Sequence, residues 1–164
     1  MKKKIAIFGS TGSIGKTLIN IIKKDKKNFE IVFLSANKNY TELIKQVKLF
    51  NVKNIVITDK SKFLIVKKIL KHKPVKVYND FTNLKKIFKK KSDYTMCAIS
   101  GIDGLYPTLN IIRFTKKIAI ANKEALICGW SLILSHLKKY KTNFIPVDSE
   151  HFSIWSLIGI NQSE

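Results

Sequence analysis

The chain has 164 residues, of which 45% are hydrophobic, and its mean hydropathy is −0.02. This length supports one domain with a proper core and leaves no room for a second full domain. No apolar run approaches the roughly 20 residues needed to cross a bilayer, and the lysine-rich start leads directly into a predicted strand, so the sequence predicts a cytoplasmic protein.

The formal net charge is +20, from 31 Lys and Arg residues against 11 Asp and Glu residues. Such a charge ordinarily favours a nucleic acid or an anionic lipid surface as a partner. Here Arg113 is the one arginine, and the lysines gather at expected helix ends and loops without a row of stacking aromatic side chains. Abundant Lys, Asn and Ile are typical of a coding bias, so we expect no specific nucleic acid and no membrane as partners.

Short runs rich in β-branched and aromatic residues alternate with longer segments of helical periodicity. Strands are predicted at residues 5–8, 29–35, 54–58, 75–78, 94–100, 117–121 and 143–147. Helices are predicted at residues 16–24, 40–50, 62–71, 83–90, 106–114 and 124–140. This alternation predicts an α/β fold, a doubly wound and mostly parallel sheet of the Rossmann type. Helices would cover both faces, and ligands would bind beyond the carboxyl ends of the strands.

The stretch GSTGSIG at residues 9–15 joins the first predicted strand to the first predicted helix. Gly9 permits a tight turn, Gly12 lets the backbone come close to a ligand, and Gly15 lets the helix pack against the strand. Free N–H groups at the helix start attract phosphate, and three hydroxyl side chains add donors where a pyrophosphate would lie. The spacing differs from the common G-x-G-x-x-G fingerprint, and a plain structural turn is the alternative, but the context favours dinucleotide binding.

The apolar segments also predict core residues. In the first helix, four apolar residues at helical spacing are expected on the buried face: Ile14, Leu18, Ile21 and Ile22. Cys97 and Cys128 each lie in an apolar stretch, so both are expected to be buried thiols rather than a disulfide. These cysteines and the scattered histidines do not form a zinc site.

The second predicted strand ends in LSANKN, where an enzyme that prefers NAD usually places an acidic residue on the ribose hydroxyls. No acid is present in this stretch. Lys38, flanked by Asn37 and Asn39, instead offers a cation and amide donors suited to the 2′-phosphate of NADP. A solvated loop lysine is the competing interpretation.

Three further polar motifs follow later strands. The glycines of SGIDG at 100–104 would let the backbone approach the nicotinamide half of a cofactor, although a simple loop fits as well. ANKE at 121–124 brings an amide, an ammonium and a carboxylate to the start of an apolar helix.

The PVDSEH motif contains two carboxylates. Asp148 and Glu150 project to one side of an extended segment, and they repel each other unless a cation lies between them. Their oxygens suit Mg²⁺ or Mn²⁺, and an acidic helix cap is the alternative.

With GSTGSIG, ANKE and PVDSEH in this order, the chain resembles the amino-terminal part of the 1-deoxy-D-xylulose 5-phosphate reductoisomerase family. The segment GLYPTLNIIRFTKKIAIANKEALI also matches the family pattern, so the resemblance covers essentially all of the chain. It implies an NADPH-dependent oxidoreductase of isoprenoid precursor synthesis. Its phosphosugar substrate, 1-deoxy-D-xylulose 5-phosphate, is rearranged and then reduced to 2-C-methyl-D-erythritol 4-phosphate. A divalent cation, Mg²⁺ or Mn²⁺, is implied as well, and a homodimer for full-length members, while the oligomeric state of this chain is left open.

The resemblance also implies roles for individual residues. Cofactor contacts are implied for Thr11, Gly12, Ser13, Ile14, Lys38, Asn39, Asn122 and Glu124. Lys123 and Ser149 are implied to bind substrate, and Lys123 also to act in catalysis by steadying developing oxyanion charge. Asp148 and Glu150 are implied as metal ligands, where the cation acts as a Lewis acid.

In domain terms, the resemblance implies an NADPH-binding Rossmann-like domain at 1–146 and the truncated start of a catalytic domain at 147–164. Two positions depart from the family pattern: Asn37 replaces a frequent glycine, and HFSIWS follows the DSEH motif. Family chains continue with another metal ligand, a phosphate pocket, a lid and a helical domain. We therefore expect this chain alone to bind NADPH but to turn over poorly or not at all. The alternatives are another NADP-dependent dehydrogenase domain and a non-enzymatic basic nucleic-acid-binding protein.

Overall fold

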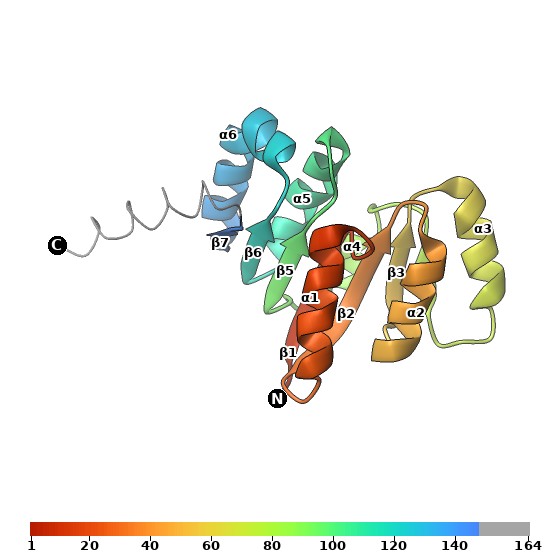
Figure 1. The fold of residues 1–164 in the computed structure, drawn as a ribbon. Helices are drawn as coiled ribbons and strands as arrows, with labels where there is room; N and C mark the ends of the chain where they lie inside the picture. Colours follow the sequence, from red (N-terminus) through yellow and green to blue (C-terminus); the bar gives the residue numbers. More distant parts are fainter. Residues whose placement is uncertain (148–164) are drawn as a thin grey trace.

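A seven-stranded sheet forms the centre of the chain (Figure 1). The computed structural model describes residues 1–147. Its strands are β1 (Lys3–Phe8), β2 (Phe29–Ala36), β3 (Asn54–Ile57), β4 (Lys76–Tyr78), β5 (Tyr94–Cys97), β6 (Lys117–Ile120) and β7 (Asn143–Pro146). Every adjacent pair is parallel, in the order β4-β3-β2-β1-β5-β6-β7. The predicted doubly wound α/β fold is confirmed, and the described sheet is wholly parallel.

The helices divide between the two faces of this sheet. One face carries α1 (Ser13–Lys24), α2 (Tyr40–Phe50) and α3 (Lys60–Ile69), whose buried side chains share one core cluster with β1, β2 and β3. The other face carries α4 (Leu84–Ile87), α5 (Leu105–Ile111) and α6 (Lys123–Tyr140), which pack in a second cluster. Two 3₁₀ turns, η1 (Ile102–Gly104) and η2 (Ile112–Phe114), flank α5. Because both faces are covered, the strands read as continuous apolar runs rather than alternating ones.

The strand order reverses at β1. From β1 the chain steps outwards to β4, and then returns to place β5 on the other side of β1. Right-handed crossovers in opposite directions put the helices on opposite faces, and they leave a crevice at the carboxyl ends of the two strands flanking the reversal. Any ligand of this fold is therefore expected between the segments that follow β1 and β5.

Two predictions about buried residues were wrong. In α1, Ile14 and Ile21 are 40% and 57% exposed. Ile22 is buried as predicted and Leu18 is partly buried against the core, and the buried residues of α1 are Gly15, Ile19 and Ile22, at a spacing of four and three. Gly15 must face the preceding turn, where a side chain would collide with backbone atoms, and this requirement sets the rotation of the helix. The apolar residues of α1 are therefore shared between the core and the surface.

The two cysteines also differ from each other. Cys97 in β5 is buried, as predicted, and burial raises the pKa of its thiol to about 12. Cys128 is exposed, contrary to the prediction. The buried stripe of α6 runs through Ala125, Leu126, Gly129, Ile133 and Leu137, and Cys128 lies beside this stripe. A long apolar helix that covers a sheet edge keeps several apolar residues in solvent, Ile127 among them.

Asp93 links β1 to Lys116, the residue before β6, and its contribution to stability should depend on pH. Its carboxylate accepts a hydrogen bond from the Lys4 backbone N–H at 2.8 Å and pairs with the Lys116 ammonium at 2.7 Å. These hydrogen bonds, led by that from Lys116, lower the pKa of Asp93 from its ordinary 3.8. A lowered folded-state pKa stabilises the fold above the ordinary value and loses that effect as pH falls through the folded one.

Asp93→Asn is therefore expected to lower the melting temperature at pH 7, with a difference from wild type that shrinks below about pH 4. Thermal unfolding followed by circular dichroism at several pH values measures it. Glu30→Gln, at an exposed position of β2, serves as the matched control. An Asp93→Asn difference that stays constant down to pH 3 would contradict the argument.

Candidate functional site

A cleft of about 420 Å³ lies at the reversal point of the sheet. It is lined by the last two residues of β2, by residues that follow β1, β2, β3, β4 and β5, and by one residue of η1: Gly9, Thr11, Gly12, Ser35, Ala36, Asn37, Thr58, Phe81, Ala98, Ile99, Ser100 and Asp103. Thr11 and Gly12, two of the predicted cofactor contacts, thus lie where the fold places a ligand. Ser13 and Ile14 begin α1 directly beside them.

The glycine turn is built as its sequence predicted. Gly9 has a φ of +79°, in the left-handed region that favours glycine, and an added Cβ there would meet the backbone of Ala98. A Cβ on Gly15 would overlap the backbone of Gly9 and Ser10. At Gly12 a Cβ would lie 3.5 Å from the Gly9 carbonyl oxygen, an ordinary contact. Gly9 and Gly15 are therefore required by the fold, whereas the fold alone does not require Gly12.

Lys38 and Asn39 follow the cleft-lining Asn37, between β2 and α2. Lys38 is exposed at this position, with its carbonyl accepting a hydrogen bond from the Tyr40 N–H at 2.8 Å. Asn39 caps α2, because its side-chain oxygen accepts a hydrogen bond from the Glu42 N–H at 3.2 Å. The cap fixes the start of the helix, and so it fixes the loop that carries Lys38 beside the glycine turn.

Asn122 clamps the opposite wall of the cleft. Only 3% of it is exposed, and its Oδ1 caps α6 by accepting from the Ala125 N–H at 2.9 Å. Its Nδ2 donates to the carbonyl oxygens of Ile99 and Gly101. This side chain therefore holds the predicted SGIDG loop in place. Lys123 and Glu124 follow it as exposed residues in the first turn of α6.

Removing the Asn122 side chain should destabilise the fold. Asn122→Ala is expected to lower the free energy of unfolding by about 2–3 kcal/mol, since it deletes a helix cap and leaves two carbonyl groups without their donor. Asn39→Ala removes a more exposed cap and is expected to cost about 1 kcal/mol. Urea denaturation of both variants measures the difference. Equal losses would mean that the bonds from Asn122 to the loop contribute nothing.

Two residues that hold the glycine turn in place were not predicted from the sequence. Ser35 at the end of β2 accepts the Gly9 N–H on its hydroxyl at 3.0 Å and the Ser10 N–H on its carbonyl at 2.8 Å. Gln46 of α2 reaches the same turn from behind, donating from Nε2 to the Ser10 carbonyl at 3.0 Å. A small polar residue closing the apolar run FEIVFLS was the available signal for Ser35. The sequence gave no such signal for Gln46, because it lies on the same side of α2 as the apolar residues Leu43 and Val47.

The predicted metal ligands Asp148 and Glu150, and the predicted substrate contact Ser149, lie outside the described residues. Within residues 1–147, no three His, Cys, Asp or Glu side chains gather in a way that could hold a metal ion. The described part of the chain thus supplies a nucleotide-sized cleft without a metal site of its own.

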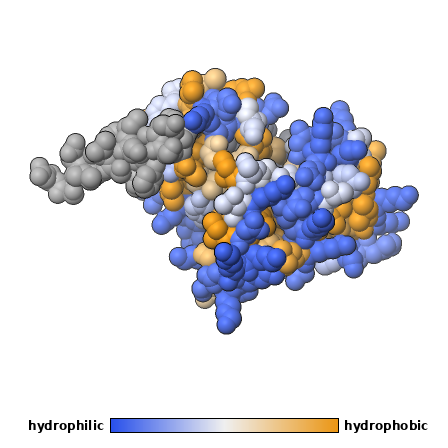
Figure 2. Space-filling view, in the orientation of Figure 1, coloured by the Kyte–Doolittle hydropathy of each residue, from blue (hydrophilic) through white to orange (hydrophobic). Residues whose placement is uncertain are grey.

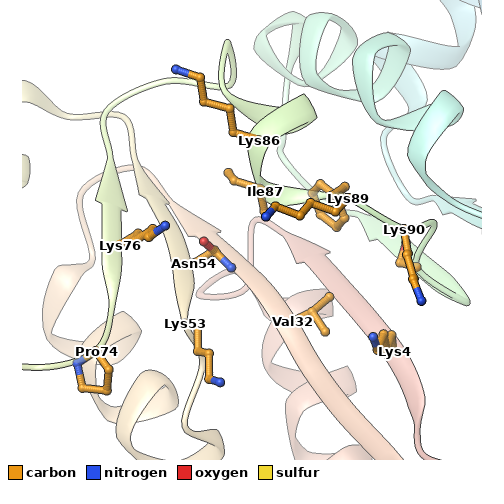
Figure 3. Close-up of a pocket in the computed structure, with 12 residues that line it drawn as sticks. Lys4, Val32, Lys53, Asn54, Pro74, Lys76, Lys86, Ile87, Lys89 and Lys90 are labelled. Carbon is orange, nitrogen blue, oxygen red and sulfur yellow. The ribbon is translucent and has the colours of Figure 1, made fainter.

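A second recess lies near the amino ends of the strands and is lined mainly by lysines (Figure 3). None of its 12 lining residues is acidic, and six are lysines: Lys4, Lys53, Lys76, Lys86, Lys89 and Lys90. Figure 3 shows Lys76 and Lys89 pointing towards Asn54 from opposite sides. Doubly wound sheets bind ligands at the other ends of their strands, so this recess adds general attraction for anions and does not resemble a second nucleotide site.

The surface agrees with the charge pattern of the sequence. In Figure 2, hydrophilic side chains cover much of the visible face, and apolar residues appear between them in several places, including the part formed by α6. Ile127 and Leu132 of this helix are 76% and 53% exposed. In residues 1–147, no helix has both the length and the hydropathy that a membrane span requires.

These features define a dinucleotide-binding domain: a doubly wound parallel sheet, a glycine turn at its reversal point, and a cleft between the segments that follow β1 and β5. Residues 5–129 match the model of the 1-deoxy-D-xylulose 5-phosphate reductoisomerase family. The chain belongs to this family.

Sequence relatives agree with this placement. The chain is 67% identical over 162 residues to 1-deoxy-D-xylulose 5-phosphate reductoisomerase of Pelagibacter ubique, covering 98% of the chain and 42% of the relative. It is 38% identical over 163 residues to the enzyme of Caldanaerobacter subterraneus, covering 99% of the chain and 42% of that relative. The chain therefore spans about 42% of the length of these curated relatives.

Solved structures match in the same way. The reductoisomerase of Zymomonas mobilis in complex with NADPH superimposes with a TM-score of 0.84 at 33% identity, over 92% of this chain and 40% of that one. A reductoisomerase in complex with NADPH, fosmidomycin and magnesium gives a TM-score of 0.83 at 26% identity, over 91% of this chain and 37% of that one. Staphylococcus aureus homoserine dehydrogenase, at 20% identity and a TM-score of 0.53, shares the fold alone.

Proposed function

We propose that the chain is the NADPH-binding part of an enzyme that converts 1-deoxy-D-xylulose 5-phosphate to 2-C-methyl-D-erythritol 4-phosphate. The observation that carries this proposal is the glycine turn at the reversal point of the sheet, in a chain 67% identical to such an enzyme. The relatives of known structure were solved with NADPH and with magnesium, which supports both as ligands of this protein. The active protein requires a longer chain, because these residues span 42% of their relatives.

The described residues fit NADPH. Gly12 leaves space for a pyrophosphate beside the start of α1, and Thr11, Ser13 and Ile14 border the same position. The N–H groups at the start of a helix favour an anion there. Lys38 and Asn39 would contact the adenosine ribose, because they follow the carboxyl end of β2, and the lysine would pair with the 2′-phosphate that NADH lacks. Asn122 and Glu124 would contact the cofactor from the other wall of the cleft. Asn122 would also keep that wall in shape, because it holds the SGIDG loop.

When bound, NADPH supplies the hydride, and the divalent cation supplies a Lewis acid for the rearrangement. Lys123 would bind the substrate and steady negative charge that develops on its oxygen, from the exposed first turn of α6. We assign the carboxylates of Asp148 and Glu150 to the cation and Ser149 to the substrate, with the remaining ligands beyond these residues.

Further parts of the proposal concern the whole protein. Residues 1–146 would form the NADPH-binding domain, and residues 147–164 would begin the catalytic one. The complete protein would act in the cytoplasm, as a homodimer. Its partners would be the cofactor and a phosphosugar rather than a specific nucleic acid, since the many lysines are accompanied by a single arginine and by no row of stacking aromatic side chains in the sequence.

The test joins this chain to the remaining part of the Pelagibacter ubique enzyme, to which it is 67% identical. NADPH oxidation is followed at 340 nm with 1-deoxy-D-xylulose 5-phosphate and Mg²⁺. The proposal predicts turnover that requires the substrate and the cation, is much slower with NADH, and is far below this level for the 164-residue chain alone. A folded joined protein that binds NADPH but does not consume this substrate would point instead to another NADP-dependent dehydrogenase.

A further inference from the structure

Gln46 is a buried amide on α2, directly behind the glycine turn. Only 1% of it is exposed. Its Nε2 donates to the Ser10 carbonyl at 3.0 Å and to a Glu42 carboxylate oxygen at 3.3 Å, while its Oε1 has no hydrogen-bond partner among the described residues. Burying an amide with one atom unpaired costs free energy that an apolar side chain of the same size would avoid. The contact with Ser10 must therefore be explained by something other than packing.

The two peptide groups of Ser10 are held by different partners, and the carbonyl that precedes Thr11 is held by Gln46. Ser10 is fully buried, and its N–H donates to the Ser35 carbonyl at 2.8 Å. Its carbonyl is held by Gln46. In a trans peptide the carbonyl and the following N–H point in opposite directions, so the Thr11 N–H is directed away from Gln46.

Within residues 1–147, the Thr11 N–H is left available for a ligand. Thr11 lines the cleft, and the backbone hydrogen bonds of the turn join Ser10 to Ser35 and Gly12 to Gly9 without using this N–H. Successive N–H groups aimed outwards from a turn attract phosphate oxygens, whereas an outward carbonyl repels them. Rotation of this single peptide would therefore exchange a donor for an acceptor on the side that faces the cleft.

We infer that Gln46 is a positioning residue of the cofactor site. By holding the Ser10 carbonyl inwards, it keeps the Thr11 N–H turned towards the pyrophosphate of the dinucleotide. Since Gln46 belongs to the helix that Asn39 caps, it also links the pyrophosphate turn to the loop that carries Lys38. This inference rests on the proposed function, in which the cleft binds NADPH.

The experiment compares how tightly two ligands bind to the Gln46→Met variant. This substitution keeps the length of the side chain and removes the hydrogen-bond donor. Isothermal titration calorimetry measures the dissociation constants of NADPH and of adenosine 2′-monophosphate, which has the 2′-phosphate but no pyrophosphate. The affinity for NADPH is expected to fall at least about tenfold, the effect of losing one hydrogen bond to a charged group. The affinity for the monophosphate should stay within about twofold. Lys45→Met, at an exposed position of the same helix, is the matched control and should change each affinity by no more than about twofold, through the lost charge alone.

An equal loss for both ligands would show that Gln46 only supports the fold, and no loss for either would show that the turn holds its shape without it; both results overturn the inference. Wild-type protein that binds neither ligand would overturn the proposed function, and the inference with it.

If Gln46→Met fails to fold, Gln46→Glu gives a second test. A buried carboxyl group donates to the Ser10 carbonyl only when it is protonated, so NADPH should bind more tightly at pH 6 than at pH 9, relative to wild type over the same range. If the ratio of the NADPH dissociation constant of Gln46→Glu to that of wild type were the same at pH 6 and pH 9, the inference would also be overturned.

Discussion

Gly15→Ala is expected to lower the free energy of unfolding by about 3 kcal/mol and to abolish measurable NADPH binding. The added Cβ would overlap backbone atoms of Gly9 and Ser10, which cannot rotate out of the way as a flexible side chain would. The turn and α1 would therefore have to separate. Separation would also displace the N–H groups at the start of α1 that we assign to the pyrophosphate.

Gly12→Ala is the matched comparison for this prediction. Its Cβ would have an ordinary 3.5 Å contact with the Gly9 carbonyl oxygen, and its φ of −76° suits any residue. We expect a change in stability within about 1 kcal/mol, together with weaker NADPH binding because the methyl group would occupy the side on which the ligand approaches. Urea denaturation and calorimetric titration of both variants separate the two effects. A Gly15→Ala protein as stable as wild type would contradict the tight packing of the turn on α1.

Lys38→Ala is expected to weaken NADPH binding about tenfold to a hundredfold, corresponding to the loss of hydrogen bonds to a charged group, and to leave NADH binding unchanged. The fold uses only the backbone of Lys38, whose carbonyl accepts the Tyr40 N–H, so stability should not change. Calorimetric titration with both cofactors at fixed ionic strength measures this selectivity.

The control for Lys38 is Lys45→Ala, which removes the same charge from an exposed position of α2. Because the chain carries a net charge of +20, any lysine removed lowers the general attraction for an anion slightly. A loss of NADPH affinity as large for Lys45→Ala as for Lys38→Ala would identify that general attraction, rather than a specific phosphate contact, as the cause.

The sheet and its helices were predictable because most strands are short apolar runs and most of the connections between elements carry Gly, Asn or Asp. The glycine turn was predictable because its requirements are mostly local: Gly9 has a positive φ, and Gly15 packs against Gly9 and Ser10, a few residues away along the chain. The rotation of α1 was not, because it depends on where Gly15 packs and not on the hydrophobic pattern that includes Ile14 and Ile21.

The residues that support the site were the least predictable. Ser35 and Gln46 contact Ser10 across 25 and 36 positions of sequence, and neither belongs to a motif. Asn122 was predicted to contact the cofactor, and its amide is engaged with the Ile99 and Gly101 carbonyls, which only the tertiary structure brings to it. Motifs thus identify what faces a ligand, while the bonds that hold a motif in shape depend on distant segments.

We propose that this chain alone forms a folded site that recognises the 2′-phosphate of NADPH. Thermal unfolding of the 164-residue chain alone, with NADPH, and with NADH at equal concentration tests it most directly. At about 100 times the dissociation constant, a ligand that binds only the folded state adds about 2.7 kcal/mol to stability. The account predicts a cooperative transition that NADPH raises much more than NADH does. Equal shifts from the two cofactors, or none from NADPH, would contradict it.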